Sequence, residues 1–134
     1  MSDQHAVLVI DDDPIFQAIV ADIPALSGTT ILSAYDGRQA LRLLDANSDN
    51  IALILTDLHM PDINGIELIL EFGNRGMRQP IVIISSADRS VVRSAETLAS
   101  VSRLDVRASL PKPVDMVALS RLIEGCLGRR AREA

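Results

Sequence analysis

The stretch Ala6–Pro14 reads AVLVIDDDP and joins a run of apolar residues directly to three adjacent aspartates. A short run that is apolar at every position is typical of a strand covered by other elements on both faces. Asp11 and Asp12 follow this strand, and their like charges repel one another unless a counter-charge lies close by. The stretch therefore predicts a buried parallel strand with a polar site at its carboxyl end.

Apolar, strand-like runs alternate with segments of helical period along the rest of the chain. The predicted strands are 6–10, 30–34, 51–56, 81–85 and 106–110, and the predicted helices are 15–26, 37–44, 65–74, 89–101 and 114–127. Five successive strand–helix units predict an α/β fold, in which right-handed crossovers build one parallel sheet with helices on both faces. Pro24 lacks a backbone donor, so we expect the first helix to bend or end early.

Length and composition set the class of protein. The 134 residues predict one domain with its core over residues 6–127, and with residues 128–134 as a tail or the start of a linker. The net charge of −5 and the lack of a basic stripe argue against direct binding of nucleic acid. The apolar runs are too short to cross a bilayer, and the N-terminus lacks the layout of a secretion signal. Because Cys126 is the single cysteine, we expect a reducing, cytoplasmic location.

Polar residues stand at the ends of the other predicted strands as well. Asp57 ends the third strand, Ser85 ends the fourth, and Lys112 follows the fifth. If the first and third strands are neighbours, Asp57 faces Asp11 and Asp12 across the crevice that forms at this edge of a parallel sheet. Clustered carboxylates suit Mg²⁺, and a lysine beside them suits phosphate oxygens. One of the carboxylates could then act as the nucleophile in phosphoryl transfer.

Four motifs, in this order and at these spacings, resemble the receiver domain of two-component response regulators. They read VLVIDDDP, LILTDLHMPDINGIEL, PIVIISS and LPKP, and the resemblance extends over roughly residues 6 to 127. It implies a flavodoxin-like, doubly wound sheet of five parallel strands in the order 2-1-3-4-5. It also implies a signalling module rather than an enzyme.

The resemblance assigns a role to each acidic residue at the strand ends. It implies that Asp57 accepts the phosphoryl group, that Asp12 binds Mg²⁺ directly, and that Asp11 does so mostly through water. The backbone carbonyl of His59 would complete the protein ligands of the ion, to which Asp57 also belongs. A side-chain role of His59 as metal ligand or general base is disfavoured, because a lone histidine is usually neither.

Two further residues would act on the phosphoryl group itself. The resemblance identifies Ser85 as the switch hydroxyl and Lys112, which precedes Pro113, as the cation that pairs with the phosphoryl oxygens. The group would come from a histidine kinase or a phosphotransfer protein and would switch the surface formed by residues 85–127. That surface would control an output domain or a partner protein, for example a domain of the cyclic-di-GMP phosphodiesterase type, and could support a weak homodimer.

Two alternatives remain open at this point. The first is a haloacid-dehalogenase-like phosphatase with Asp11 as nucleophile and Asp13 as acid/base, although Asp13 also has an ordinary interpretation as a helix N-cap. Such enzymes need a further acidic pair after the lysine. The acidic residues in that part of the chain are widely spaced, namely Asp115, Glu124 and Glu133. The second alternative, a receiver that signals without phosphate, is disfavoured because every residue of the acceptor site is present.

The chain departs from the family pattern three residues before the lysine. Many receivers carry an aromatic side chain there, and this chain has Ser109. The aromatic residues of the chain are Phe16, Tyr35 and Phe72, and none lies on the last predicted strand. The signal must therefore travel through a backbone shift or through repacking of residues 89–101. The segment between Ser85 and Lys112 also looks long, which predicts an extended fourth helix before a short last strand.

Overall fold

A computed structural model describes residues 6–128 of the chain, so the segment 129–134 of the predicted tail lies outside the described residues. The strands are β1 (Ala6–Ile10), β2 (Thr30–Ala34), β3 (Ile51–Thr56), β4 (Pro80–Ser85) and β5 (Asp105–Pro111). The helices are α1 (Pro14–Ala21), α2 (Gly37–Asn47), α3 (Gly65–Asn74), α4 (Arg89–Val101) and α5 (Met116–Leu127), and a short 3₁₀ helix, η1 (Pro24–Leu26), follows α1.

Within residues 6–128 the strands form one parallel sheet in the order β2-β1-β3-β4-β5. The fold and strand order that the resemblance implied are therefore confirmed. β1 lies between β2 and β3, with Ile10 opposite both Ala34 and Thr56. Because all strands run in the same direction, their carboxyl ends meet along one edge of the sheet.

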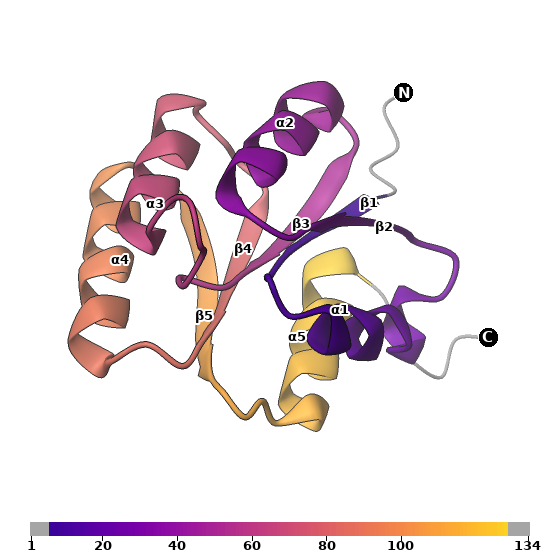
Figure 1. Cartoon of the computed structure of the whole chain (residues 1–134). Coiled ribbons are helices and arrows are strands. Elements are labelled where there is room, and N and C mark those ends of the chain that lie inside the picture. Colours follow the sequence, from indigo (N-terminus) through magenta and orange to yellow (C-terminus); the bar gives the residue numbers. More distant parts are fainter. Residues whose placement is uncertain (1–5, 129–134) are drawn as a thin grey trace.

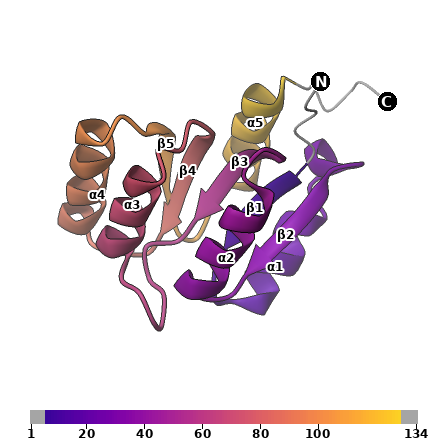
Figure 2. The same cartoon turned by 90° about the horizontal axis from the view of Figure 1, so that it is seen from above.

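The helices cover the two faces of the sheet in separate layers (Figures 1 and 2). α2, α3 and α4 lie on one face, and α1 and α5 lie on the other. The side chains of β1 alternate between the two layers, because successive side chains of a strand point to opposite faces. Leu8 and Ile10 join the apolar cluster under α2, α3 and α4, while Val7 and Val9 join the cluster under α1 and α5.

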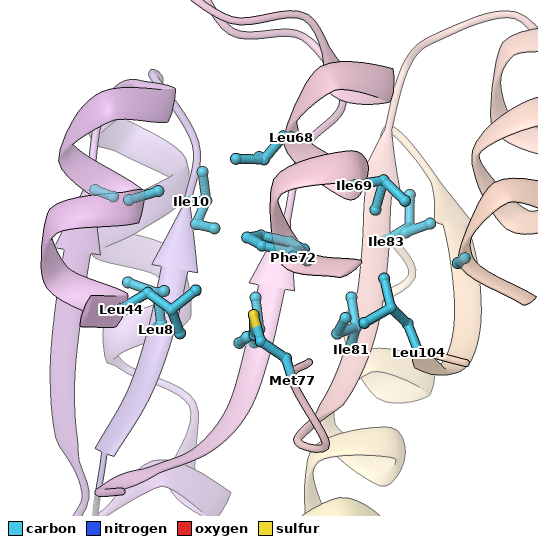
Figure 3. Packing of buried hydrophobic residues seen from close by; sticks show 14 of the residues in the cluster. Leu8, Ile10, Leu44, Leu68, Ile69, Phe72, Met77, Ile81, Ile83 and Leu104 are labelled. Carbon is cyan, nitrogen blue, oxygen red and sulfur yellow. The ribbon is translucent and has the colours of Figure 1, made fainter. Parts of the chain in front are cut away.

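Phe72 lies at the centre of the cluster beneath α3 (Figure 3). Its side chain is fully buried and lies between the side chains of β1 and those of β4. Complete burial of an aromatic or large aliphatic side chain stabilises a fold by about 1.5–3 kcal/mol relative to exposure. The two clusters thus hold the sheet rigid from both sides and leave its carboxyl edge to the polar residues.

Several element ends differ from the sequence-based expectations. α1 ends at Ala21, and Pro24 starts the separate helix η1, so the predicted early end of the first helix is confirmed. α5 begins at Met116 rather than at residue 114, because the side chain of Asp115 accepts hydrogen bonds from the backbone N–H groups of the first turn. α2 extends to Asn47, three residues beyond the predicted end.

The last strand is longer than the sequence predicted. The sequence predicted a short strand over 106–110, whereas β5 contains seven residues, Asp105–Pro111. Pairing with β4 along its whole length explains the difference, since Pro80 lies opposite Asp105 and Ser85 lies opposite Pro111. α4 runs over Arg89–Val101 as predicted. Among the described residues, no helix has the length and apolar character needed to traverse a bilayer.

Candidate functional site

The carboxyl edge of β1 and β3 holds two buried aspartates. The backbone N–H of Asp11 donates to the carbonyl of Ala34 at 3.0 Å, and that of Asp57 donates to the carbonyl of Ile10 at 2.9 Å. These bonds continue the pairing of the strands by one residue, so each aspartate is fixed at the point where its strand ends. Asp11 is 1% exposed and Asp57 is 4% exposed.

Asp12 completes a cluster of three carboxylates. One carboxylate oxygen of each of Asp11, Asp12 and Asp57 lies within 4.8 Å of the others, and Asp12 is exposed to solvent. The expectation that the first and third strands are neighbours, and that Asp57 faces Asp11 and Asp12, is therefore confirmed. The cluster is closed towards the sheet and open to water at Asp12.

Lys112 supplies the counter-charge that this cluster needs. Its ammonium Nζ lies 2.6 Å from Asp11 Oδ2 and 3.1 Å from Asp57 Oδ2, and it also lies 4.8 Å from the centre of the Phe16 ring. The backbone of Lys112 is fixed as well, because its N–H donates to the carbonyl of Ser85 at 3.1 Å. The loop after β5 thereby places one cation between the two buried carboxylates.

The pKa values of this ion pair reflect burial and charge together. Burial raises the pKa of the Asp11 carboxyl, and the hydrogen bonds from Lys112 and from the Asp13 N–H oppose this effect only in part. Burial alone would lower the pKa of Lys112, but its hydrogen bonds to Asp11 and Asp57 outweigh burial and raise it. Lys112 therefore stays a charged ammonium at neutral pH.

The carboxylate of Asp57 is held in one orientation. Its Oδ1 accepts hydrogen bonds from the backbone N–H groups of Leu58 at 2.6 Å and His59 at 3.1 Å, and its Oδ2 accepts from Lys112. His59 therefore stands next to the cluster through its backbone, while the residue as a whole is exposed. These three hydrogen bonds leave the Asp57 carboxylate little freedom to rotate.

Ser85 stands on the other side of the acidic cluster at the end of β4. It is 3% exposed, and its Oγ accepts a hydrogen bond from the backbone N–H of Ala87 at 3.0 Å. The backbone carbonyl of the same residue accepts from Lys112, so Ser85 and Lys112 are structurally linked. The structure thus gathers the ends of β1, β3, β4 and β5 around one small polar site.

Asp13 has the structural role of a helix N-cap that its sequence context suggested, and Asn64 caps a second helix. Asp13 is the N-cap of α1, with its Oδ1 accepting from the N–H of Ile15 at 2.9 Å. Asn64 is the N-cap of α3, with its Oδ1 accepting from the N–H of Glu67 at 2.9 Å. A side chain engaged as a helix cap is poorly placed to act as an acid or base, so the geometry disfavours the phosphatase alternative that needed Asp13.

Asp62 contacts the backbone of a helix that is distant in sequence. Its carboxylate accepts hydrogen bonds from the N–H groups of Gly37 at 2.8 Å and Arg38 at 3.0 Å, at the start of α2. Partial burial raises the pKa of this carboxyl, but the hydrogen bonds from Gly37 and Arg38 and from two backbone groups of its own loop lower it further, below its usual range. Asp62 therefore joins the loop after β3 to a helix far away in sequence.

A pocket of about 410 Å³ lies beside Ser85, between α4 and β5. Ser109, which stands where many receivers have an aromatic residue, lines this pocket and donates a hydrogen bond from its Oγ to Glu96 Oε2 at 2.7 Å. At the position where many receivers have an aromatic ring, this chain therefore has a polar contact between α4 and β5.

One buried polar residue was missed by the sequence analysis. Gln17 is 3% exposed and contacts the backbone at the end of β1 through its side-chain amide. The available signal was a glutamine three residues before Val20 on the buried face of the first helix. Its partners are backbone carbonyls, which no side-chain pattern identifies.

The donor set of the acidic cluster fits Mg²⁺. The three side chains offer carboxylate oxygens, which are the ligands this ion prefers, and the exposure of Asp12 gives access to the water molecules that Mg²⁺ usually retains. The cluster is also compact enough for its oxygens to converge on one small ion. The residues present are therefore compatible with a magnesium site.

Comparison with known proteins agrees with this fold and this arrangement of charges. The family model of the response regulator receiver domain matches residues 7–124, and the chain belongs to this family. Receiver domains of two-component response regulators are signalling domains that are phosphorylated on an aspartate and bind Mg²⁺ at an acidic site.

Two curated relatives illustrate the similarity at the level of sequence. The Regulator of RpoS from Escherichia coli (strain K12) is 32% identical over 123 residues, which cover 90% of this chain and 34% of the relative. The transcriptional regulatory protein CpxR from Klebsiella pneumoniae is 35% identical over 127 residues, which cover 93% of this chain and 50% of the relative. The chain thus spans between a third and a half of the length of these relatives.

Solved structures match the fold along nearly the whole chain. A response regulator from Colwellia psychrerythraea has a TM-score of 0.76 and 28% identity, with coverage of 95% of this chain and 99% of the other. A response regulator receiver protein from Pseudomonas putida has a TM-score of 0.75 and 24% identity, with coverage of 93% and 99%. The second likeness concerns the fold alone.

Proposed function

We propose that Asp57 accepts a phosphoryl group from a histidine kinase or a phosphotransfer protein in a Mg²⁺-dependent reaction. The observation that carries the proposal is the placement of the Asp57 carboxylate, which two backbone N–H groups and Lys112 orient beside Asp11. An oriented carboxylate next to a cation has the features of an activated nucleophile for phosphoryl transfer.

The chemistry needs one bond to form and one to break. A carboxylate oxygen of Asp57 attacks the phosphorus atom of the donor, and the bond from phosphorus to the donor nitrogen or oxygen breaks with its electron pair on the leaving group. An acyl phosphate forms on Asp57. When bound by Asp11, Asp12, Asp57 and the backbone carbonyl of His59, Mg²⁺ supplies positive charge that offsets the charge of the phosphoryl oxygens.

Lys112 and Ser85 act on the transferred group. The Lys112 ammonium, which bridges Asp11 and Asp57, pairs with a phosphoryl oxygen once Asp57 has been phosphorylated. The Ser85 hydroxyl exchanges its hydrogen bond with the Ala87 N–H for one that it donates to another phosphoryl oxygen. This exchange releases the loop between β4 and α4.

The switch that follows involves α4 and β5. Ser85 lines the same pocket as Ser109 and Glu96, so movement of the loop after β4 reaches the hydrogen bond that joins α4 to β5. We propose that this route replaces the aromatic coupling of other receivers. The surface of α4, β5 and α5 then controls an attached output domain or a partner protein, with a weak homodimer as a further state.

The same proposal covers the organisation of the chain. We propose that residues 1–134 form a single receiver domain that works in the cytoplasm and has no catalytic output of its own. The Regulator of RpoS and CpxR are about three times and twice as long as their matched parts, which supports an output function carried by another segment or protein. A cyclic-di-GMP phosphodiesterase-type domain is one candidate for that output.

Incubation with Mg²⁺ and acetyl phosphate, followed by mass spectrometry of the intact protein, tests the proposal. We expect the wild type to gain the mass of one phosphoryl group and Asp57→Ala to gain none. Asp49→Ala, which removes an exposed aspartate after α2, serves as the control and should be modified like the wild type. A mass gain that persists in Asp57→Ala would overturn the assignment of the acceptor, and no gain in the wild type would overturn the function.

A further inference from the structure

Gln17 places a polar amide in the buried layer between α1 and the sheet. Its Nε2 lies within hydrogen-bond distance of three backbone carbonyls, those of Val9 at 2.9 Å, Asp11 at 3.1 Å and Ala34 at 3.1 Å. The amide has two N–H groups, so one of them is shared between two acceptors. One side chain of α1 thereby contacts the ends of both β1 and β2.

The position of these carbonyls is significant, because the pairing of β1 with β2 stops at Ile10 and Ala34. Asp11 has already left the strand, and its N–H donates to the same Ala34 carbonyl that accepts from Gln17. Gln17 therefore fixes the backbone at the step where β1 turns into the loop that carries Asp11 and Asp12. Without this contact, the ends of β1 and β2 would lose two hydrogen bonds, and the loop would lose one at Asp11, next to the acidic cluster.

The contact has an energetic cost. The amide oxygen of Gln17, Oε1, is buried and has no hydrogen-bond partner among the described residues. Leaving a buried acceptor unpaired destabilises the folded state, because its hydrogen bond with water is not replaced. A methionine or leucine of similar size would avoid this cost and would suit the surrounding apolar cluster. The glutamine is thus explained by its donors and by what they hold, rather than by packing.

We propose that Gln17 is a positioning residue for the magnesium site. By fixing the backbone of residues 9–11, it holds the carboxylates of Asp11 and Asp12 close to Asp57 before the cation binds. Ligands that are held in place by such outer contacts bind metals more tightly, because less order has to be created on binding. The inference rests on the proposed function, since it assumes that the acidic cluster binds Mg²⁺.

The test compares Gln17→Met with Val20→Ala. The first variant removes the donors and keeps the length of the side chain, while the second removes buried apolar volume from the same face of α1, away from the carboxylates. Isothermal titration with Mg²⁺ should give a dissociation constant about tenfold higher for Gln17→Met. Val20→Ala should lower the stability of the fold and bind Mg²⁺ with the wild-type affinity.

A second measurement, made without metal, follows the amide hydrogen exchange of Asp11 and Asp13. Both N–H groups belong to the loop after β1 and are hydrogen-bonded, that of Asp11 to the carbonyl of Ala34 and that of Asp13 to the Asp11 carboxylate. After correction for the difference in global stability between the two variants, exchange at both sites should be faster in Gln17→Met than in Val20→Ala. Wild-type Mg²⁺ affinity in Gln17→Met, or an equal loss of affinity in Val20→Ala, would overturn the inference. If Gln17→Met does not fold, Gln17→Asn, which keeps the amide but shortens its reach, should show the same weakened binding.

The wild-type titration separates this inference from the proposed function. Absence of Mg²⁺ binding by the wild type would contradict the function itself, and the exchange of Asp11 and Asp13 in the metal-free protein would still report whether Gln17 tethers the loop. Binding by the wild type together with unchanged binding and exchange in Gln17→Met would contradict the role of Gln17 alone.

Discussion

At the scale of single residues, the site depends on how each charge is placed next to its partner. Asp11 and Asp57 are buried, and Lys112 contacts both, so the repulsion between two carboxylates is balanced by one ammonium. A buried ion pair of this kind adds little net stability, but it fixes the position of its members. For the proposed function, this pair would keep Asp57 beside Asp11 and Lys112 before the phosphoryl group arrives.

Asp62→Ala tests a charge outside the site. The variant loses the hydrogen bonds to Gly37 and Arg38, so we expect the free energy of unfolding at pH 7 to fall by about 1 kcal/mol. Because the pKa of Asp62 in the folded chain lies below the unperturbed value of 3.8, its stabilising effect is complete above pH 3.8. It is lost as the pH falls through the lower, folded-state pKa.

Urea unfolding of both proteins over a range of pH checks this prediction. The difference in stability between wild type and Asp62→Ala should shrink as the pH falls through the folded-state pKa of Asp62, where the carboxylate becomes protonated. Asp49→Ala, at the other end of α2, should show no comparable difference at pH 7. A difference that stays constant down to the lowest accessible pH would show that the charge of Asp62 is not what stabilises the start of α2.

The sequence allowed the prediction of site residues that carry a charged side chain at the end of a strand. Asp11, Asp12 and Asp57 stand at strand ends, and the structure brings them together as expected. Gln17 and Asp62 were not recognised in these roles, because their partners are backbone groups, which lie up to 17 and 25 positions away, respectively. Such contacts exist only once the chain has folded.

At the scale of elements, the ends of the helices are set by caps and by individual residues, because hydrophobic periodicity does not determine them. The bounds of β1, β2, β3, α3 and α4 agree with the sequence-based prediction. The start of α5 does not agree, since a capping aspartate sets it, whereas α1 ends early, as expected from Pro24, and a proline-led 3₁₀ turn follows it. Hydrophobic spacing identifies the middle of a helix, whereas its ends depend on individual hydrogen bonds.

The first residue of α3 gives a prediction at this scale. A Cβ atom added at Gly65 would lie 2.6 Å from both the Cβ atom and the carbonyl oxygen of Leu58, in the loop that follows Asp57. Backbone cannot yield easily, so we expect Gly65→Ala to destabilise the fold by about 1–3 kcal/mol. Gly125, inside α5, has open space around it, and Gly125→Ala should stabilise by about 0.5–1 kcal/mol.

Chemical denaturation of the two alanine variants provides the measurement, each being the control of the other. The same substitution should move the unfolding midpoint in opposite directions. If Gly65→Ala unfolds at the wild-type urea concentration, the close approach of α3 to Leu58 does not constrain this position.

At the scale of the whole molecule, two apolar layers support one polar edge. The general α/β architecture followed from the alternation of strands and helices, but the order of the strands came only from the resemblance to receivers. Alternation alone does not say which strands are neighbours, because that depends on the direction in which each crossover returns. The pocket beside Ser109 was also out of reach, since the hydrogen bond to Glu96 joins residues of different elements.

Binding of Mg²⁺ should stabilise the entire domain, because the ligands come together only in the folded chain. At a free Mg²⁺ concentration of about one hundred times its Kd, we expect a gain of about 2.7 kcal/mol in the free energy of unfolding. For a chain of this size the gain corresponds to ~10 °C in Tm. Calorimetric melting with Mg²⁺ and with a chelator measures it.

Asp12→Ala and Asp49→Ala are matched variants for this experiment, since each removes one exposed carboxylate. The stabilisation by Mg²⁺ should be lost in Asp12→Ala and retained in Asp49→Ala. Equal stabilisation of the two variants would place the cation somewhere other than the acidic cluster.

The unbroken apolar character of β1 has a consequence for how the chain finds its native alignment. If the register of this strand shifted by one residue, each aliphatic side chain would move to the opposite face of the sheet. Both faces are apolar, so this exchange alone would cost little free energy. The same shift would, however, move the Asp11 carboxylate into the apolar core and separate it from Lys112. The aspartates proposed to serve phosphotransfer thus also mark the residue at which β1 has to end, so the same residues help to fix the register of the sheet.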